Sequence, residues 1–236
     1  MINKFSHSIT DMINPIFDGA SIMISGFGEA GSPIELIHAL IDHGAKELTV
    51  INNNTGSGQV GLAALIANGQ VRKMICSFPR TANSTVFPEL YRANKIELEL
   101  VPQGTLAERI RAGGAGIPAF YTATSVGTPL SEGKEIRRFE NTDTVMERGL
   151  TADFALIKAR CADRYGNLTY HKTARNFAPI MAMAAKTTLV QTQHCVEAGE
   201  MDPESVITPG IFVNHITTVS QPQQESLLVA QGHVYP

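Results

Sequence analysis

The segment of this chain with the clearest chemical potential is a cluster of three glycines, Gly26, Gly28 and Gly31. The only large side chain among them belongs to Phe27, and Ser25 precedes the cluster. Glycine lets a backbone turn sharply and approach a ligand closely. Backbone amides in such a loop, beside the positive end of a following helix, favour an anionic or carbonyl-bearing ligand. The sequence therefore predicts a ligand-binding loop here.

The same glycines spell G-x-G-x-x-G, the motif of dinucleotide-binding proteins. That motif needs a carboxylate near the end of the second strand, where it holds a ribose hydroxyl. The expected second strand, residues 48–51, is instead followed by three asparagines. A dinucleotide-dependent oxidoreductase is therefore the weaker hypothesis, and it stays open as an alternative of a different class.

Side-chain amides form a second group of candidate ligand-binding residues. Asn53 and Asn54 follow the second expected strand, and Gln103 follows the fourth. An amide donates hydrogen bonds to a carboxylate without a fixed charge that would trap a product. Asparagine is also common in turns, and Gln103 could equally cap the next helix. We expect all three to bind the carboxylate of a small acid, with these structural roles as the alternative.

Charged residues near these loops are ambiguous. Arg80, Arg109 and Arg175 suit either a phosphate or carboxylate ligand or ordinary surface ion pairs. Glu29 lies inside the glycine loop, where a carboxylate could act as a nucleophile or base. An acid near a helix start is stabilised by about 0.3–1 kcal/mol whatever its function. We interpret Glu29 as part of the loop and not as a catalytic group.

The elements that must position these residues alternate between strands and helices. Apolar runs predict strands at residues 21–24, 48–51, 73–77 and 96–101, with helices between them. In the helix after the glycine loop, Ser32 and Glu35 match a capping box. Alternation of this kind predicts an α/β fold, an open, mainly parallel sheet with helices on both faces. Ligands of such sheets bind at the carboxyl ends of the strands, where the glycine loop and the amides fall.

The later part of the chain contains four recognisable stretches. Residues 113–121 are glycine-rich, and a lid and a crossover are both compatible with them. Residues 132–148 are charged and predict a solvated excursion with a hairpin. Residues 178–185 predict a tightly packed buried helix. We expect one domain over residues 1–219 and a flexible tail over residues 220–236, which is rich in glutamine and proline.

Composition excludes several classes of protein. The 236 residues are 43% hydrophobic and 17% charged, which suits one large globular domain. A net charge of −3 gives no general attraction to nucleic acid. The three cysteines lie far apart without metal-ligand spacing, so we expect buried, reduced thiols and no metal site. No signal peptide and no membrane-spanning apolar run are visible, so we expect a cytoplasmic protein without a membrane partner.

Longer blocks of the chain match a known family. Residues 18–33 read Asp-Gly-x-x-(three apolar)-(small)-Gly-Phe-x-x-x-Gly-x-Pro. Together with residues 102–110, 113–122, 152–159 and 172–177, they resemble the A (alpha) subunit of family I coenzyme A transferases. The resemblance extends over nearly the whole chain up to Val219. One departure is Ser25, where the family usually has glycine, and this difference leaves the loop shape to be determined.

The resemblance implies a reaction, and blocks within the family suggest a substrate. Such enzymes move coenzyme A from an acyl-CoA to a free carboxylate. Residues 71–80, 179–185 and 207–213 resemble relatives that use succinyl-CoA and 3-oxoadipate, in the breakdown of aromatic compounds. Residues 113–122 are closer to relatives that use acetoacetate, so acetoacetate or another short acid stays an alternative.

The resemblance also implies a division of labour between two polypeptides. The partner is the B subunit, whose glutamate attacks the thioester and becomes a glutamyl-CoA thioester, which the second acid opens. The partner's Ser-Glu-Asn-Gly motif is absent here, and the nearest match, residues 131–133, lacks the asparagine. We therefore expect no catalytic nucleophile in this chain, no permanently bound cofactor, and a heterodimer or heterotetramer with the B subunit. The residues expected to contact the coenzyme A thioester are Ile24, Ser25, Gly26, Phe27, Gly28, Glu29 and Ala30.

Overall fold

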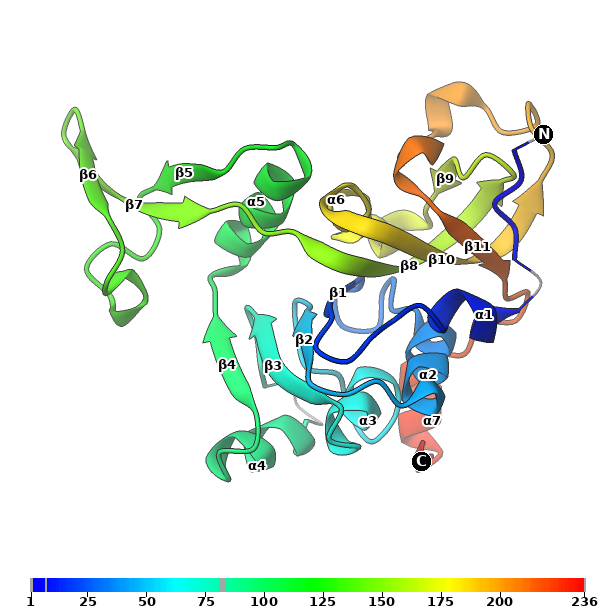
Figure 1. Ribbon diagram of the computed structural model, residues 1–236, viewed down its shortest axis with the longest axis horizontal. Coiled ribbons are helices and arrows are strands. Elements are labelled where there is room, and N and C mark those ends of the chain that lie inside the picture. Colours follow the sequence, from blue (N-terminus) through cyan, green and yellow to red (C-terminus); the bar gives the residue numbers. More distant parts are fainter. Residues whose placement is uncertain (1, 7, 81–83, 236) are drawn as a thin grey trace.

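The main feature of the fold is one sheet of parallel strands, shown in Figure 1. The computed structural model describes residues 2–6, 8–80 and 84–235. The strands are β1 (Ser21–Ile24), β2 (Leu48–Ile51), β3 (Val71–Cys76), β4 (Glu97–Leu100), β8 (Ala152–Asp163), β9 (Leu168–Thr169), β10 (Ala185–Val196) and β11 (His215–Thr218). Their order is β11-β10-β8-β1-β2-β3-β4, and the short β9 pairs antiparallel with β8. The expected open, mainly parallel sheet is confirmed.

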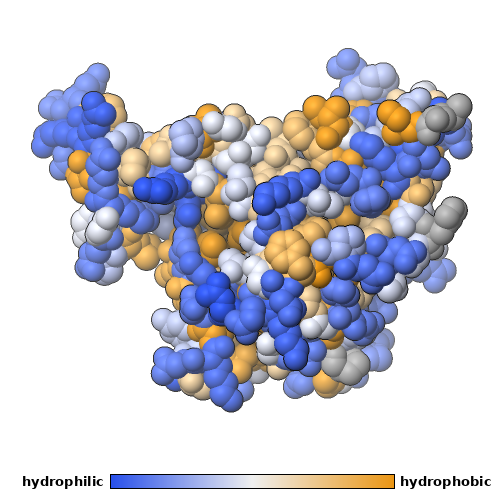
Figure 2. Space-filling model, viewed as in Figure 1, coloured by the Kyte–Doolittle hydropathy of each residue, from blue (hydrophilic) through white to orange (hydrophobic). Residues whose placement is uncertain are grey.

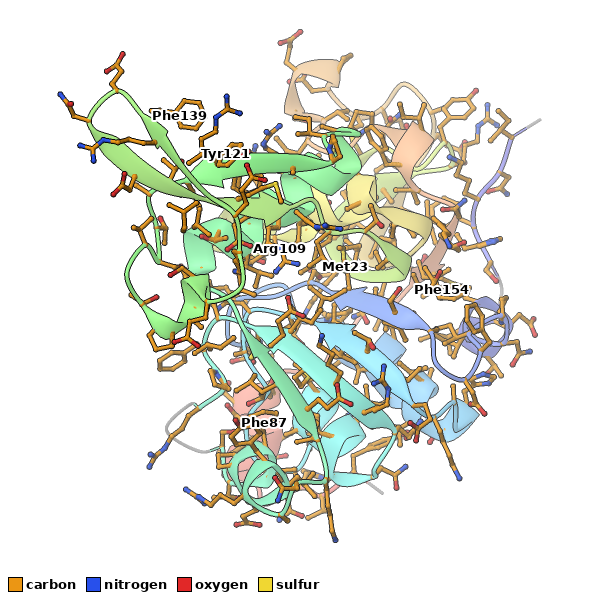
Figure 3. All side chains as sticks on the ribbon, turned by 60° about the vertical axis from the view of Figure 1, so that its left-hand side comes forward. Met23, Phe87, Arg109, Tyr121, Phe139 and Phe154 are labelled. Carbon is orange, nitrogen blue, oxygen red and sulfur yellow. The ribbon has the colours of Figure 1, made fainter. Side chains whose placement is uncertain are left out.

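Helices cover both faces of this sheet. The helices α1 (Ile9–Ile13), α2 (Ile34–His43), α3 (Gly61–Ala67) and α4 (Val86–Arg92) pack on one face, and α5 (Gln103–Gly114) and α6 (Ala178–Ala184) pack on the other. Side chains of β1 alternate between the two cores, since Ile22 and Ile24 belong to the first and Met23 to the second. Figure 3 shows Met23 and Phe87 on opposite sides of the sheet. The predicted two-sided burial is confirmed.

The start of α2 differs from the sequence-based expectation. Its N-cap residue is Pro33, which makes no side-chain cap, and Oε1 of Gln191 accepts from the amide of Leu36 in the first turn (3.2 Å). Glu35 instead accepts hydrogen bonds from Nε2 of Gln191 (2.5 Å) and from the amide of Gln223 (2.6 Å). The predicted capping box with Ser32 is therefore wrong, because partners distant in the sequence occupy the carboxylate.

A small antiparallel sheet projects from the body of the molecule, and we call residues 119–148 the arm (Figure 1). Its strands are β5 (Ala119–Thr122), β6 (Ile136–Phe139) and β7 (Thr142–Arg148), in the order β5-β7-β6. All four residues of β6 are exposed. Figure 2 shows mainly hydrophilic side chains at the end of the arm, and Figure 3 shows Tyr121 and Phe139 packed together there. The predicted solvated hairpin is confirmed.

The second glycine-rich segment is a tightly packed crossover. A Cβ atom on Gly113 would collide with the carbonyl oxygen of Leu150, and one on Gly149 would lie 2.5 Å from the carbonyl oxygen of Ile117. The amide of Leu150 also donates to the carbonyl of Arg109 (2.7 Å). Backbone packed this closely favours the crossover over the lid.

The end of the chain lies against the body, and we call residues 220–235 the C-terminal strap. It contains the helix α7 (Glu225–Ala230). Val229 lies directly over Gly58, where a Cβ atom would come within 2.6 Å of its Cγ2. The ring of Tyr235 stacks on His38 with 3.7 Å between centroids. The strap thus has a helix and contacts that its composition did not predict, while the domain boundary at residue 219 and the mobility of the tail stay predictions.

Candidate functional site

The carboxyl ends of four neighbouring strands bring the predicted residues to one edge of the sheet. Ser25 follows β1, Asn53 follows β2, Ser77 follows β3 and Gln103 follows β4. Parallel pairing from β1 to β4 aligns these ends. The convergence expected from topology alone is therefore present in the structure.

Ser25 fixes the base of the glycine loop. Its hydroxyl donates to the carbonyl of Gly31 (2.7 Å) and accepts from the amide of Lys158 on β8 (3.2 Å). Its own amide donates to the carbonyl of Leu156 (3.0 Å). Ser25 is not among the residues with positive φ. Serine in place of the family's usual glycine is therefore compatible with the loop and ties it to the neighbouring strand.

The tip of the glycine loop is open to solvent. The three glycines adopt positive φ of +130°, +58° and +84°, and the amide of Phe27 donates to the carbonyl of Ala30 (3.0 Å). Ile24, Ser25 and Gly26 are buried, Glu29 and Ala30 are half-buried, and Phe27 and Gly28 are exposed. The ring of Phe27 is 51% exposed. A rigid turn therefore presents an aromatic ring and a glycine at the sheet edge.

A turn distant in the sequence supports this loop. The short 3-10 helix at Lys172–Arg175 precedes Asn176, whose Nδ2 donates to the carbonyl of Ala30 (2.7 Å). A Cβ atom on Gly31 would lie 2.5 Å from the carbonyl oxygen of Ala174. Sequence reasoning noted residues 172–177 only through the family resemblance, and it missed this contact.

Two of the three predicted amide side chains meet directly. Oδ1 of Asn53 accepts from Oγ of Ser77 (2.6 Å) and from Nε2 of Gln103 (2.9 Å). Asn53 is 3% exposed, whereas Gln103 lies at the surface. This group of three residues joins the ends of β2 and β3 to the first residue of α5.

Asn54 has a different environment from the one expected. Its Oδ1 accepts from the amide of Gly56 (2.8 Å), so the side chain braces its own turn. Asn52 braces the same turn. Oδ1 of Asn52 accepts from the amide of Asn54 (2.8 Å), and Nδ2 of Asn52 donates to the carbonyl of Ile24 (2.8 Å). Sequence reasoning did not single out Asn52, which links residues 52–60, here called the asparagine loop, to the glycine loop.

A cavity of about 340 Å³ lies beside these loops. Its lining residues are Glu29, Ser57, Glu225, Ser226, Val229 and Ala230. Oε1 of Glu225 accepts from the amide of Ser57 (2.9 Å). Burial raises the pKa of Glu225 to about 7, the Ser57 amide opposes this rise, and the negative charge of Glu29 adds to it. Glu225 falls within the expected tail and was not predicted to contact the site.

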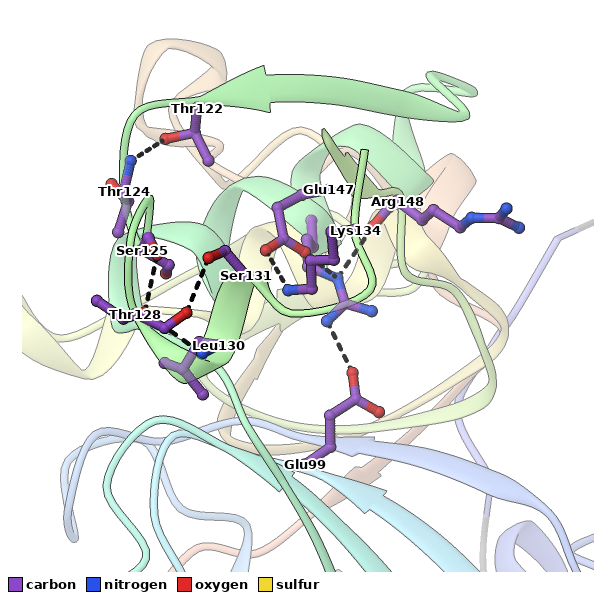
Figure 4. Close-up of polar contacts among 11 residues, drawn as sticks. Glu99, Thr122, Thr124, Ser125, Thr128, Leu130, Ser131, Lys134, Glu147 and Arg148 are labelled. Atoms are coloured by element: carbon purple, nitrogen blue, oxygen red, sulfur yellow. Dashed lines mark hydrogen bonds and ion pairs between the residues drawn. The ribbon is translucent and has the colours of Figure 1, made fainter. Parts of the chain in front are cut away.

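Arg109 belongs to the attachment of the arm and not to the sheet-edge site. Its guanidinium donates to Glu99 (2.8 Å) and to the carbonyl of Arg148 (3.0 Å). It also lies 4.0 Å from Glu147, which is 3% exposed and pairs with Lys134 (2.5 Å), as Figure 4 shows. This network favours the ion-pair interpretation of Arg109.

Other sequence candidates lie at the surface. Arg80, Arg175 and Glu132 are exposed there. The cysteines differ from the expectation of buried thiols, because Cys76 is buried, Cys161 is half-buried and Cys195 is exposed. Within residues 2–6, 8–80 and 84–235, no three His, Cys, Asp or Glu side chains are arranged to hold a metal ion. In the same ranges, no helix has the length and apolar character needed to cross a bilayer.

Comparison with known proteins points to one family. The model of the family described as Coenzyme A transferase matches residues 6–218. The chain is 58% identical to the A subunit of 3-oxoadipate CoA-transferase from Pseudomonas putida, over 98% of this chain and 100% of that protein. It is 52% identical to the A subunit of the probable succinyl-CoA:3-ketoacid coenzyme A transferase from Bacillus subtilis (strain 168), over 91% of this chain and 90% of that protein.

Two solved structures have the same fold. An acyl-CoA transferase of Escherichia coli O157:H7, in a thioester complex with CoA, matches with a TM-score of 0.82 and 23% identity. The match covers 94% of this chain and 51% of that one, so this chain spans about half its length. Glutaconate coenzyme A-transferase of Acidaminococcus fermentans matches with a TM-score of 0.80 and 20% identity, over 94% of this chain and 78% of that one. These likenesses support the fold.

Proposed function

Because this chain belongs to the coenzyme A transferase family, we propose that it is the A subunit of a 3-oxoacid CoA-transferase that passes coenzyme A from succinyl-CoA to 3-oxoadipate. The observation that carries this proposal is the 58% identity, over the full length of the relative, to the A subunit of a 3-oxoadipate CoA-transferase. Acetoacetate is the second candidate acceptor, since a 3-ketoacid relative is 52% identical. The comparisons give no support to a dinucleotide-dependent oxidoreductase, and β2 is followed by asparagine where that activity needs an acid.

The proposed reaction has two halves that each conserve one thioester and one carboxylate. In the first, the B subunit's glutamate carboxylate attacks the carbonyl of the succinyl thioester, the C–S bond breaks, and a succinyl–glutamyl anhydride and the coenzyme A thiolate form. The thiolate then attacks the glutamyl carbonyl, and succinate leaves with one of the glutamate oxygens. The coenzyme A sulfur is then bonded to the glutamyl carbonyl. In the second half, the carboxylate of 3-oxoadipate attacks the glutamyl thioester and expels the coenzyme A thiolate, which forms a second anhydride. The thiolate then attacks the 3-oxoadipyl carbonyl, and the glutamate leaves as its carboxylate. The balance requires no oxidant, reductant or permanently bound cofactor.

In this reaction the glycine loop would receive the thioester end of coenzyme A. The loop keeps residues 24–26 buried and presents Phe27 and Gly28 to solvent, so a thioester held by a second subunit can reach the backbone. An oxyanion forms at the carbonyl in each half-reaction, and fixed backbone donors stabilise such charge effectively. The hydrogen bond from Asn176 to the carbonyl of Ala30 supports this role, because it holds the loop in place.

The group formed by Asn53, Ser77 and Gln103 would bind the carboxylate of the acceptor acid. Nε2 of Gln103 carries two hydrogens, and it donates one to Asn53. The exposed Gln103 can therefore offer the other to a carboxylate. In this proposal Asn53 orients Gln103, and Asn54 shapes the turn that holds Asn53 in place. These side chains carry no charge, so the product acid is released as readily as the substrate binds.

The chain would act only within an assembly. Residues 131–133, the nearest match to the partner's nucleophile motif, lie within the arm, and Glu132 is exposed there. We therefore place the nucleophile on the B subunit, in a heterodimer or heterotetramer. We further place the enzyme in the cytoplasm, in the breakdown of aromatic compounds, without a nucleic acid or membrane partner.

A reconstitution assay tests the proposal. The purified chain, alone and mixed with the B subunit, is given succinyl-CoA with either 3-oxoadipate or acetoacetate. We expect no turnover by the lone chain, turnover by the mixture, and a higher kcat/KM for 3-oxoadipate. Turnover by the lone chain would contradict a nucleophile on the B subunit. A higher kcat/KM for acetoacetate would select the second acceptor, and tight NADH binding by the chain would support the oxidoreductase.

A further inference from the structure

The C-terminal strap contacts the asparagine loop and faces the glycine loop across a cavity. Its helix α7 borders the 340 Å³ cavity, whose other walls come from Glu29 of the glycine loop and Ser57 of the asparagine loop. At one end of the strap, the amide of Gln223 is bonded to Glu35. At the other end, the amide of Tyr235 donates to the carbonyl of Gln59 (2.9 Å). A segment fixed at both ends between two loops is well placed to set their relative position.

The strap holds the second half of the loop that begins at Asn53. The amide of Ser57 donates to Glu225 (2.9 Å), and Val229 covers Gly58 so closely that a Cβ atom would come within 2.6 Å. The first half of the loop is braced by its own asparagine side chains. The strap therefore holds the half of the loop that the asparagine side chains do not brace.

Glu225 anchors this contact in an unusual environment for a carboxyl group. It is 6% exposed and begins the first turn of α7. Burial raises its pKa to about 7, and Glu29 faces it from the glycine loop. The other residues that line the cavity are uncharged, and two further acids that contact the strap, Glu35 and Asp42 of α2, bind Gln223 and Tyr235. The anchor therefore changes charge near neutral pH, beside loops assigned to an anionic substrate.

We propose that Glu225 is a positioning residue for the acid-binding part of the site, holding the asparagine loop through the amide of Ser57 and facing Glu29 across the cavity. This inference rests on the proposed function, and Glu225 does not touch the reacting atoms. When Glu225 ionises, it repels both Glu29 and an incoming carboxylate. The KM for the acceptor acid therefore rises as the pH increases through about 7, while kcat changes little.

Steady-state kinetics of the assembled A and B subunits test the proposal between about pH 6 and pH 8.5. Glu225→Gln keeps an oxygen that accepts from Ser57 and carries no charge, so its KM for the acid should lose the dependence on pH. Glu225→Ala removes the acceptor and the charge, so its KM should be about tenfold above the wild-type value at pH 6, the size expected for one lost hydrogen bond, and should not depend on pH. The wild-type KM should rise several-fold over the same range.

Two variants serve as controls. Glu89→Gln removes a carboxylate from the first turn of α4, away from the cavity, and should keep the wild-type pH dependence. Leu227→Ala changes an exposed position of α7 and should keep the wild-type KM. Glu225→Gln with the wild-type pH dependence, or Glu225→Ala with the wild-type KM, would overturn the proposal. If neither Glu225 variant folds, Val229→Ala loosens the same contact and should raise the KM for the acid.

The failure of the proposed function can be separated from the failure of this inference. If the wild-type subunits do not transfer coenzyme A, the proposed function is wrong. The positioning role of Glu225 is then tested by hydrogen exchange. Amides of residues 54–58 should then exchange faster in Glu225→Ala than in the wild type, with amides of β8 unchanged. Equal exchange in the loop would overturn the positioning role by itself.

Discussion

The hydroxyl of Ser25 donates to the carbonyl of Gly31 at 2.7 Å and closes the base of the glycine loop. It also accepts from the amide of Lys158, so one buried side chain joins the loop to β8. Ser25→Ala leaves both backbone groups without this partner, and we expect a loss of about 1–3 kcal/mol in the free energy of unfolding. Urea denaturation of Ser25→Ala and of the wild type measures this loss. Ser205→Ala, at an exposed position, should cost far less, and an equal loss would contradict the role of Ser25.

Substitutions at two glycines with the same backbone conformation separate the cost of backbone strain from the cost of a steric clash. Gly19 and Gly31 have φ of +83° and +84°, but only Gly31 faces a close neighbour, the carbonyl of Ala174. Gly19→Ala should cost about 1–2 kcal/mol, the usual penalty of the left-handed region. Gly31→Ala should cost about 1–3 kcal/mol more, because the added methyl group displaces the turn at residues 172–176. Thermal unfolding compares the two, and equal losses would show that this turn does not support the loop.

The arm depends on Arg109 for its attachment. Arg109→Met removes the contacts to Glu99, to the carbonyl of Arg148 and to the buried Glu147. We expect faster hydrogen exchange in β5 and β7 and a loss of about 1–3 kcal/mol in the free energy of unfolding. Arg111→Met breaks only an exposed ion pair within α5 and should change stability by about 0.5 kcal/mol or less. Unchanged exchange in the arm of the Arg109 variant would contradict this attachment.

Asn53→Asp tests the proposed acid-binding cluster. Aspartate can still accept from Ser77 and Gln103, so the loop should keep its shape. Its negative charge would repel the substrate carboxylate and hold Gln103 more tightly. With the B subunit present, we expect the KM for 3-oxoadipate to rise about 10- to 100-fold, the effect of a charged hydrogen bond. Asn141→Asp, in the exposed turn of the arm, should have no effect, and a wild-type KM for Asn53→Asp would remove this residue from the site.

His38 makes stability depend on pH. Its Nε2 accepts from the amide of Gly61 (3.0 Å), which a protonated imidazole cannot do. Burial lowers the pKa of His38, against the opposing charges of Glu35 and Asp42. The unfolded chain binds this proton near pH 6.5, so its contribution is complete above that pH and is lost as the pH falls through the lower folded-state pKa.

The measurement for His38 is the free energy of unfolding in urea between about pH 5 and pH 8. Other groups titrate in this range, so the informative quantity is the difference from His38→Gln, which removes the ionisable ring. That difference should shrink towards low pH. His215→Gln, at an exposed position of β11, should follow the wild type. A constant difference for His38→Gln would contradict the assignment.

The sequence predicted the sheet well where local signals are strong. The bounds of β1 and β2 match the predicted residues 21–24 and 48–51, because each strand is a short apolar run between turn residues. The meeting of Asn53 with Gln103 was also predictable, since parallel strands end at one edge. The cap of α2 was not predictable, because the partners of Glu35 come from positions 191 and 223.

The features that could not be predicted from the sequence depend on contacts between distant segments. Asn176 reaches the glycine loop from 146 positions away, and Glu225 reaches Ser57 from 168 positions away. Neither residue lies in a pattern that predicts such a partner. The glutamine and proline content of the strap is typical of disordered segments. Its position depends instead on contacts with α2 and with the loop between β2 and α3.

Residues near both ends of the described chain contact the body, so a probe is better attached elsewhere. Lys4 donates to the carbonyl of Gly210 (2.6 Å) near one end, and Tyr235 stacks on His38 near the other. An affinity peptide fused after residue 236 would begin next to Tyr235 and could disturb its stacking on His38. The turn at Glu140, between the exposed ends of β6 and β7, is the better place for a fluorescent label.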